Sequence, residues 1–145
     1  IACTEKLYES WSEMGADMSG YTIEELRFAA MHHDLGKVGF PGDGNEVYQV
    51  ETSDWHRKNQ GSIFTQNGEL HYMDVTHRAL WTLQKYGIQF TQKEMLGIML
   101  ADGLYNKGNE KYFISYDENF QLKTELPYLL HWADHMSTII ERQTA

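Results

Sequence analysis

A histidine and an aspartate stand side by side in this chain where an apolar helical segment ends. The pair, His33 and Asp34, lies within the stretch from Ala29 to Gly39. Adjacent side chains cannot both point the same way into solvent, but they can hold a divalent cation if other helices supply the remaining ligands. An imidazole nitrogen and a hard carboxylate suit Mn²⁺, Co²⁺, Ni²⁺, Fe²⁺ or Zn²⁺ and, less well, Mg²⁺. The pair therefore predicts a metal site built between helices.

Apolar residues at helical spacing predict a mostly α-helical fold. In two places a threonine is followed three residues later by a glutamate, the pattern of a capping box, so helices are expected to begin at Thr22 and Thr91. Gly36 is expected to stop the helix that carries His33 and Asp34. Further helices are expected over 1–14, 75–86 and 126–140.

The segment from 37 to 74 is irregular in pattern, apart from a short helix expected over 53–60. A loop of about 35 residues is long for a compact domain, and such loops are often functional. A small β-hairpin is expected over 112–123, where two short aromatic runs flank a polar turn.

The composition fits a single compact domain spanning 1–145, because the chain is 145 residues long and 41 % hydrophobic. Its 21 acidic and 12 basic residues give a formal charge of −9, which argues against a stable complex with nucleic acid. An acidic protein can still process phosphates, because bound cations reverse the local potential. No run is long enough to span a membrane, no signal peptide is visible, and the lone Cys3 forms no internal disulfide, so we expect a cytoplasmic protein.

The stretch from His33 to Lys37, His-Asp-Leu-Gly-Lys, resembles the signature of the HD superfamily of metal-dependent phosphohydrolases. The resemblance implies a helical bundle of the HD-domain type and a divalent metal cofactor. It also implies that an Ala-Asp step on a late helix supplies the last metal ligand, which here is Asp134. An acid on a helix rich in Leu, Ala and Ile needs a partner if it is buried, and a cation would provide one.

Other residues match the family pattern less closely. His56 occupies the stretch where binuclear members carry a further histidine; the alternative is an exposed loop histidine. Asp102 follows an alanine where such members offer another histidine, and it either serves as an oxygen ligand or caps a helix end. Arg57 and Lys58 beside His56 suit phosphate recognition. Arg78 could also reach a substrate phosphate, unless it only solvates a helix surface.

The family pattern begins with a histidine on the first helix, and no histidine precedes His32 in this chain. The chain opens at Ile1 without a methionine, so we expect this ligand to lie just upstream on the same helix. The alternative is a degenerate metal site.

The resemblance also suggests how catalysis would proceed. A bound cation lowers the pKa of water from about 15.7 towards neutrality, and Asp34 would orient this water towards phosphorus. Lys37, one turn beyond Asp34, would steady the charge of the transition state; the alternative is a lysine that interacts with the helix dipole.

The leading hypothesis is hydrolysis of a phosphate ester, monoester or diester, by a metal-activated water. A small phosphorylated substrate such as a nucleotide is favoured over a polymer, and homo-oligomerisation stays open. The alternative is a catalytically degenerate HD domain that acts as a nucleotide-binding or regulatory module. A third hypothesis is a helical interaction module whose histidines are incidental.

Overall fold

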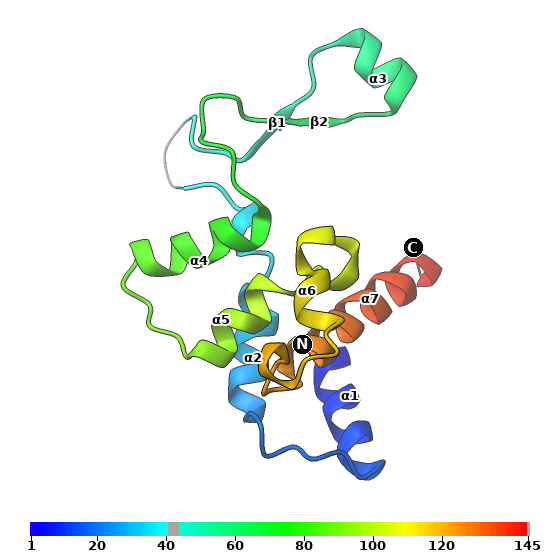
Figure 1. The fold of residues 1–145 in the computed structure, drawn as a ribbon. Coiled ribbons are helices and arrows are strands. Elements are labelled where there is room, and N and C mark those ends of the chain that lie inside the picture. The colour runs from blue at the N-terminus through cyan, green and yellow to red at the C-terminus, as the bar shows by residue number, and fades with distance from the viewer. Residues whose placement is uncertain (41–43, 145) are drawn as a thin grey trace.

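A computed structural model describes residues 1–40 and 44–144 of the chain. It shows a helical body from which a thin arm projects (Figure 1). The helices of the body are α1 (Ala2–Glu13), α2 (Ile23–His32), α4 (Val75–Lys85), α5 (Gln92–Met99), α6 (Glu110–Phe113) and α7 (Leu126–Thr144). Short 3-10 turns lie between them: η1 (Leu35–Lys37), η2 (Gly103–Tyr105), η3 (Lys107–Asn109) and η4 (Glu118–Phe120). The arm consists of β1 (Tyr48–Val50), α3 (Asp54–Gln60) and β2 (Phe64–Gln66). The prediction of a mostly helical fold is confirmed.

The predicted capping boxes open α2 and α5. The Thr22 hydroxyl accepts a hydrogen bond from the backbone N–H of Glu25, and the Glu25 carboxylate accepts one from the N–H of Thr22. Thr91 and Glu94 form the same reciprocal pair. Each box satisfies N–H groups that the first helical turn leaves without partners, so both helices begin where the sequence predicts.

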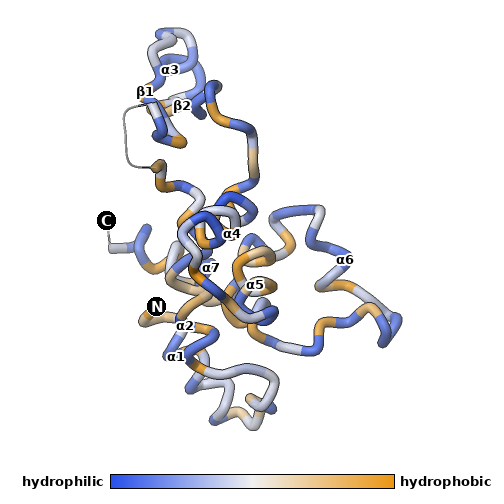
Figure 2. Tube along the Cα trace, turned by 90° about the vertical axis from the view of Figure 1, so that its left-hand side faces the viewer, coloured by the Kyte–Doolittle hydropathy of each residue, from blue (hydrophilic) through white to orange (hydrophobic). Residues whose placement is uncertain are grey.

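The core lies where α2, α5 and α7 meet. Leu26, Ile98 and Leu129 are fully buried there, and Figure 2 shows the hydrophobic stretches of α2 and α5 near the centre of the body. Gly97 makes this packing possible, because a Cβ at that position would collide with the side chain of Leu126 and touch the Cβ of Ala29. The close approach of α5 fixes the distance between α2 and α7, the helices that carry the candidate ligands.

The sequence predicted that Gly36 stops the helix, and this prediction is wrong. The last residue of α2 is His32, and Gly36 lies in the following turn η1 with a negative φ. It is buried, and a Cβ there would fall on the backbone carbonyl of Val75 in the first turn of α4. Glycine is needed at this position for the close approach of η1 to α4, and this contact sets where the residues around it point.

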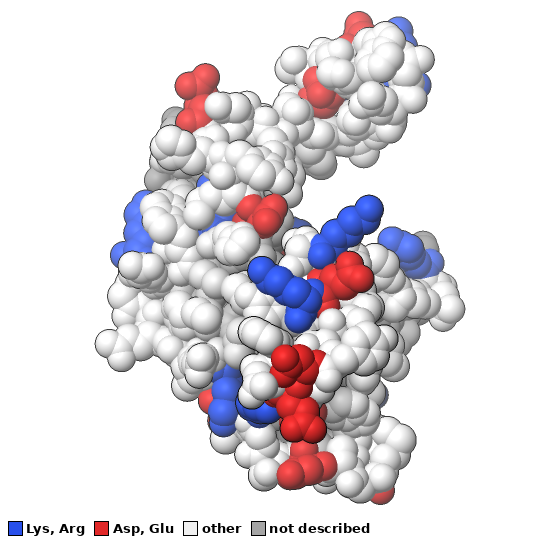
Figure 3. Space-filling model, viewed as in Figure 1, with Lys and Arg blue, Asp and Glu red and all other residues white. Residues whose placement is uncertain are grey.

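The arm leaves the body after η1 and returns at the start of α4. Its strands pair antiparallel, with Tyr48 opposite Gln66 and Gln49 opposite Thr65. All residues of both strands are exposed, and Figure 3 shows that the arm stands clear of the body on this face. The helix expected over 53–60 is confirmed as α3, capped by the Ser53 side chain.

The prediction of a β-hairpin over 112–123 is wrong. That segment forms the end of α6 and the turn η4, and the antiparallel pair is in the arm instead. The reason is local: the Asp117 carboxylate accepts from the N–H of Asn119, and the Ser115 hydroxyl accepts from the N–H of Asp117. Such side-chain bonds offer the backbone an alternative to a β ladder. Phe113 also packs edge-on against Tyr128 of α7, which holds the segment to the body.

None of the helices in the described part of the chain combines the length and apolar character that crossing a bilayer requires.

Candidate metal centre

His33 caps the C-terminus of α2, and its ring is oriented by the helix itself. Nδ1 lies 2.9 Å from the carbonyl oxygen of Ala30, so in the neutral imidazole Nδ1 carries the proton and donates it. Nε2 then presents a lone pair. This atom is buried and makes no hydrogen bond. A histidine with one nitrogen bound to a backbone carbonyl and the other bare is arranged as metal-ligating histidines are.

Asp134 of α7 faces this bare nitrogen. Its Oδ1 lies 3.4 Å from His33 Nε2, and Oδ2 of Asp34 lies 3.9 Å from the same atom. Two ligands at about 2.1 Å from one tetrahedral ion are themselves about 3.4 Å apart. The structure therefore brings together His33, Asp34 and Asp134 from distant parts of the chain, and the His33–Asp134 spacing fits shared ligation.

Lys37 engages the remaining carboxylate. Its Nζ lies 2.6 Å from Oδ2 of Asp34, one turn earlier. Within residues 1–40 and 44–144, no three His, Cys, Asp or Glu side chains are grouped closely enough to hold an ion as they stand. In this arrangement His33 and Asp134 are the two side chains already placed to share an ion, whereas the Asp34 carboxylate is paired with the ammonium group of Lys37.

The pKa values follow from these contacts. Burial lowers the pKa of His33, but the carboxylates of Asp134 and Asp34 outweigh it, so the net pKa lies above its ordinary value of 6.5. The contact with His33 holds the pKa of Asp134 below its ordinary value of 3.8, against the effect of burial. Burial likewise lowers the pKa of Lys37, and Asp34 and Asp134 raise it further than burial lowers it. Without a cation the site is an ion-paired cluster.

Asp134 also lines a cavity of about 340 Å³. Asp102 and Arg142 line it together with Asp134, and so does Tyr105, whose hydroxyl lies 3.1 Å from Nδ1 of His135. Asp102 stands at the start of η2 and makes no side-chain capping bond there. Its carboxylate instead shares the cavity with Asp134.

Sequence reasoning missed Arg142, which lines the cavity together with Tyr105 and Asp134. The signal was present for Arg142: residues 131, 134, 135, 138 and 142 recur at helical spacing on α7, and all of them line this cavity. His131, on the same stripe, also contacts the backbone: its Nδ1 lies 3.0 Å from the carbonyl oxygen of Ala101.

The arm carries the other predicted residues away from this centre. His56, Arg57 and Lys58 lie on α3, at the far end of the arm from α2 and α7 (Figure 1). His56 Nδ1 is 3.3 Å from the carboxylate of Glu51, within the arm. The structure does not bring these residues close to His33. A metal or phosphate site that involved them would therefore be distinct from the centre at His33 and Asp134.

Arg78 is not a solvated residue of the helix surface. It is 6 % exposed, and its guanidinium donates to the carbonyl oxygen of His71 at 2.6 Å. It lines a different cavity, at the foot of the arm.

No protein-family model, curated protein or solved structure matches the chain.

Proposed function

We propose that this chain hydrolyses a phosphate ester of a small molecule with the help of a divalent metal ion held between α2 and α7. The observation that carries the proposal is the buried Nε2 of His33, which has no hydrogen bond and lies 3.4 Å from the Asp134 carboxylate. The resemblance of the His33–Lys37 stretch to the HD signature supports the same chemistry. Without a cation, a protonated His33 is paired with Asp134, and a cation bound between these groups would take the place of that proton.

Each residue has a role that follows from its position. His33 and Asp134 would hold the ion, and Asp34 would complete the set or orient the attacking water. When bound, a divalent cation supplies a Lewis acid, which withdraws charge from phosphoryl oxygens and lowers the pKa of water from about 15.7 towards 7. Lys37, kept protonated by its acidic neighbours, would donate hydrogen bonds to the phosphoryl oxygens and balance their negative charge.

The cavity beside Asp134 supports a nucleotide or a similar small phosphorylated metabolite as substrate. Its walls combine a guanidinium, Arg142, with an aromatic ring, Tyr105. Arginine binds phosphate oxygens through paired N–H donors, and an aromatic face stacks on a base. A volume of about 340 Å³ falls within the range of small-molecule sites.

Metal content and hydrolysis test the proposal together. The purified protein is stripped with a chelator, reloaded separately with Mn²⁺, Co²⁺, Ni²⁺, Fe²⁺, Zn²⁺ or Mg²⁺, and assayed for phosphate release from nucleoside monophosphates, cyclic nucleotides and generic phosphate esters. We expect Asp134→Asn to lose both bound metal and turnover. Glu141→Gln, which removes an exposed acid from the same helix, is the matched control and should retain both. Turnover that is indifferent to chelation, or full metal binding by Asp134→Asn, contradicts the proposal.

A second candidate function is nucleotide binding without turnover. Ala101 stands where the resemblance implies a further histidine, and among the described residues no three potential ligands converge. In that case a nucleoside monophosphate binds beside Asp134 with measurable affinity, and no metal in the panel produces phosphate release.

A further inference from the structure

The foot of the arm encloses a second cavity, of about 200 Å³, outside the candidate metal centre. Its walls come from η1, from the ends of β1 and β2, from the loop that follows β2, and from the first turn of α4. Tyr48 and Gln66, which pair across the strands, lie on it, and so does Arg78. None of the side chains that line it, among the described residues, is acidic.

Arg78 gives this cavity a buried positive charge. The residue is 6 % exposed, and arginine does not lose its proton in proteins. Its bond to the His71 carbonyl uses one of five N–H donors. Among the described residues no carboxylate lies within ion-pair distance of the guanidinium. A buried charge without a counter-charge is costly, so this arrangement favours an anion.

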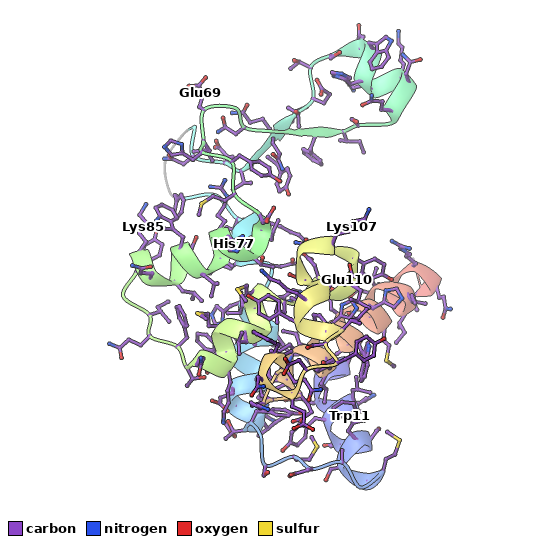
Figure 4. All side chains as sticks on the ribbon, in the orientation of Figure 1. Trp11, Glu69, His77, Lys85, Lys107 and Glu110 are labelled. Atoms are coloured by element: carbon purple, nitrogen blue, oxygen red, sulfur yellow. The ribbon has the colours of Figure 1, made fainter. Side chains whose placement is uncertain are left out.

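The acids nearest the cavity in sequence, Asp74 and Glu69, do not pair with Arg78. Asp74, just before α4, lies 3.4 Å from His77 and 3.3 Å from the hydroxyl of Tyr72. Glu69, on the loop after β2, points away from the foot of the arm (Figure 4). The backbone N–H groups that begin α4 add to the positive potential, because Val75 of its first turn lies on the cavity wall.

We propose that this cavity binds a phosphate-type oxyanion through Arg78, either as free phosphate or as the phosphoryl group of a ligand. The volume is too small for a drug-sized molecule but equals that of several waters at about 30 Å³ each. A tetrahedral oxyanion fits this size, and Gln66 and Tyr48 place further polar groups at the rim. An anion held here would contact both the arm and α4, and would tie the arm to the body. The proposal is independent of the hydrolysis proposed above.

The direct test is titration of the protein with inorganic phosphate by calorimetry, with EDTA present and ionic strength held constant. The key variant is Gln66→Glu, which changes an exposed residue on the cavity wall to an acid of the same shape. Gln49→Glu adds the same charge on the opposite face of the same hairpin and is the matched control. We expect the wild type and Gln49→Glu to bind alike, and Gln66→Glu to bind at least fivefold more weakly.

Two further variants show whether Arg78, rather than the metal centre, holds the anion. Arg78→Met should abolish binding, with circular dichroism to check its fold; if it fails to fold, the Gln66→Glu comparison decides. Asp134→Asn should bind phosphate as the wild type does, because the metal centre is not involved. No binding by the wild type, or equal weakening by Gln66→Glu and Gln49→Glu, overturns the proposal.

A second titration with a nucleoside monophosphate, on the Asp134→Asn background, identifies the source of the anion. Tighter binding than that of inorganic phosphate, still weakened by Gln66→Glu, assigns the cavity to the phosphoryl group of a larger ligand. Equal or weaker binding assigns it to the free anion.

Discussion

The contact between His33 and Asp134 predicts a coupling energy that changes with pH in the metal-free protein. The perturbation is a double-mutant cycle made of His33→Gln, Asp134→Asn and the double variant. The charges lie 3.4 Å apart, a distance that corresponds to about 5 kcal/mol at an effective dielectric constant of 20 and about 1 kcal/mol in water. The Asp134 side chain is 41 % exposed and that of His33 is 18 % exposed. Solvent screening therefore brings the expected coupling to about 1–2 kcal/mol.

The pH window follows from the directions of the two pKa shifts. The folded-state pKa of His33 is raised above 6.5, so its contribution is complete below pH 6.5 and is lost as pH rises through the folded value. The folded-state pKa of Asp134 is lowered below 3.8, so its contribution is complete above pH 3.8 and is lost as pH falls through the folded value. The coupling should therefore be largest between these two ordinary values.

The assay is urea unfolding of the four proteins in EDTA, at pH 5 and at pH 9, followed by circular dichroism. We expect the full coupling at pH 5 and much less at pH 9. Coupling below about 0.3 kcal/mol at pH 5 would lie within the additivity error for independent sites. That result would show that the two side chains do not meet in solution, and the proposed ligand pair would fall with it.

Three other predictions concern the same fold. Mn²⁺ requires a neutral His33, so its affinity, measured by calorimetry, should fall up to tenfold per pH unit below the raised pKa of His33; a flat profile argues against ligation by this residue. Gly36→Ala should lower the free energy of unfolding in urea by about 1–3 kcal/mol, because the new Cβ would collide with the backbone of Val75. Gly68→Ala is the control and should not be destabilising, because a Cβ there has open space around it. Equal effects of the two variants would disprove the close approach of η1 to α4. Tyr21→Phe should leave the free energy of unfolding unchanged or raise it by about 1 kcal/mol, because the Tyr21 hydroxyl is buried without a hydrogen bond. Tyr116→Phe, at a 98 % exposed position, is the control and should be neutral. A loss of stability in Tyr21→Phe would show that the hydroxyl has a hydrogen-bond partner.

The helix starts could be predicted because their determinants are local. Thr22 and Thr91 each meet their glutamate three residues later, within one turn. The approach of Asp134 to His33 is different, because the residues are 101 positions apart and no periodicity connects them. It was expected only through the resemblance to the HD signature, and the packing of α2, α5 and α7 is what achieves it.

The arm and the 112–123 segment show why the sequence pattern could not give the rest. Strands β1 and β2 are only three residues each and exposed, so they are too short for an alternation of apolar and polar residues to be recognised as a strand. The 112–123 segment has the aromatic composition of strands, but the side chains of Ser115 and Asp117 accept hydrogen bonds from two of its backbone N–H groups. Arg78 was assigned to a solvated face or a substrate because its burial depends on the arm, whose path was not predicted.

The turn η1 contributes to both proposed sites. Mutations can therefore distinguish a change in η1, which affects both sites, from a change confined to one of them. Asp34 and Lys37 reach the metal centre, whereas Gly36 between them lies on the wall of the phosphate cavity and against α4. A shift of η1 must therefore move both sites, so Gly36→Ala should weaken metal binding and phosphate binding together. Asp134→Asn should affect the metal alone, and Gln66→Glu the phosphate alone. If Gly36→Ala weakens only one of them, the two sites do not share this turn as a common support.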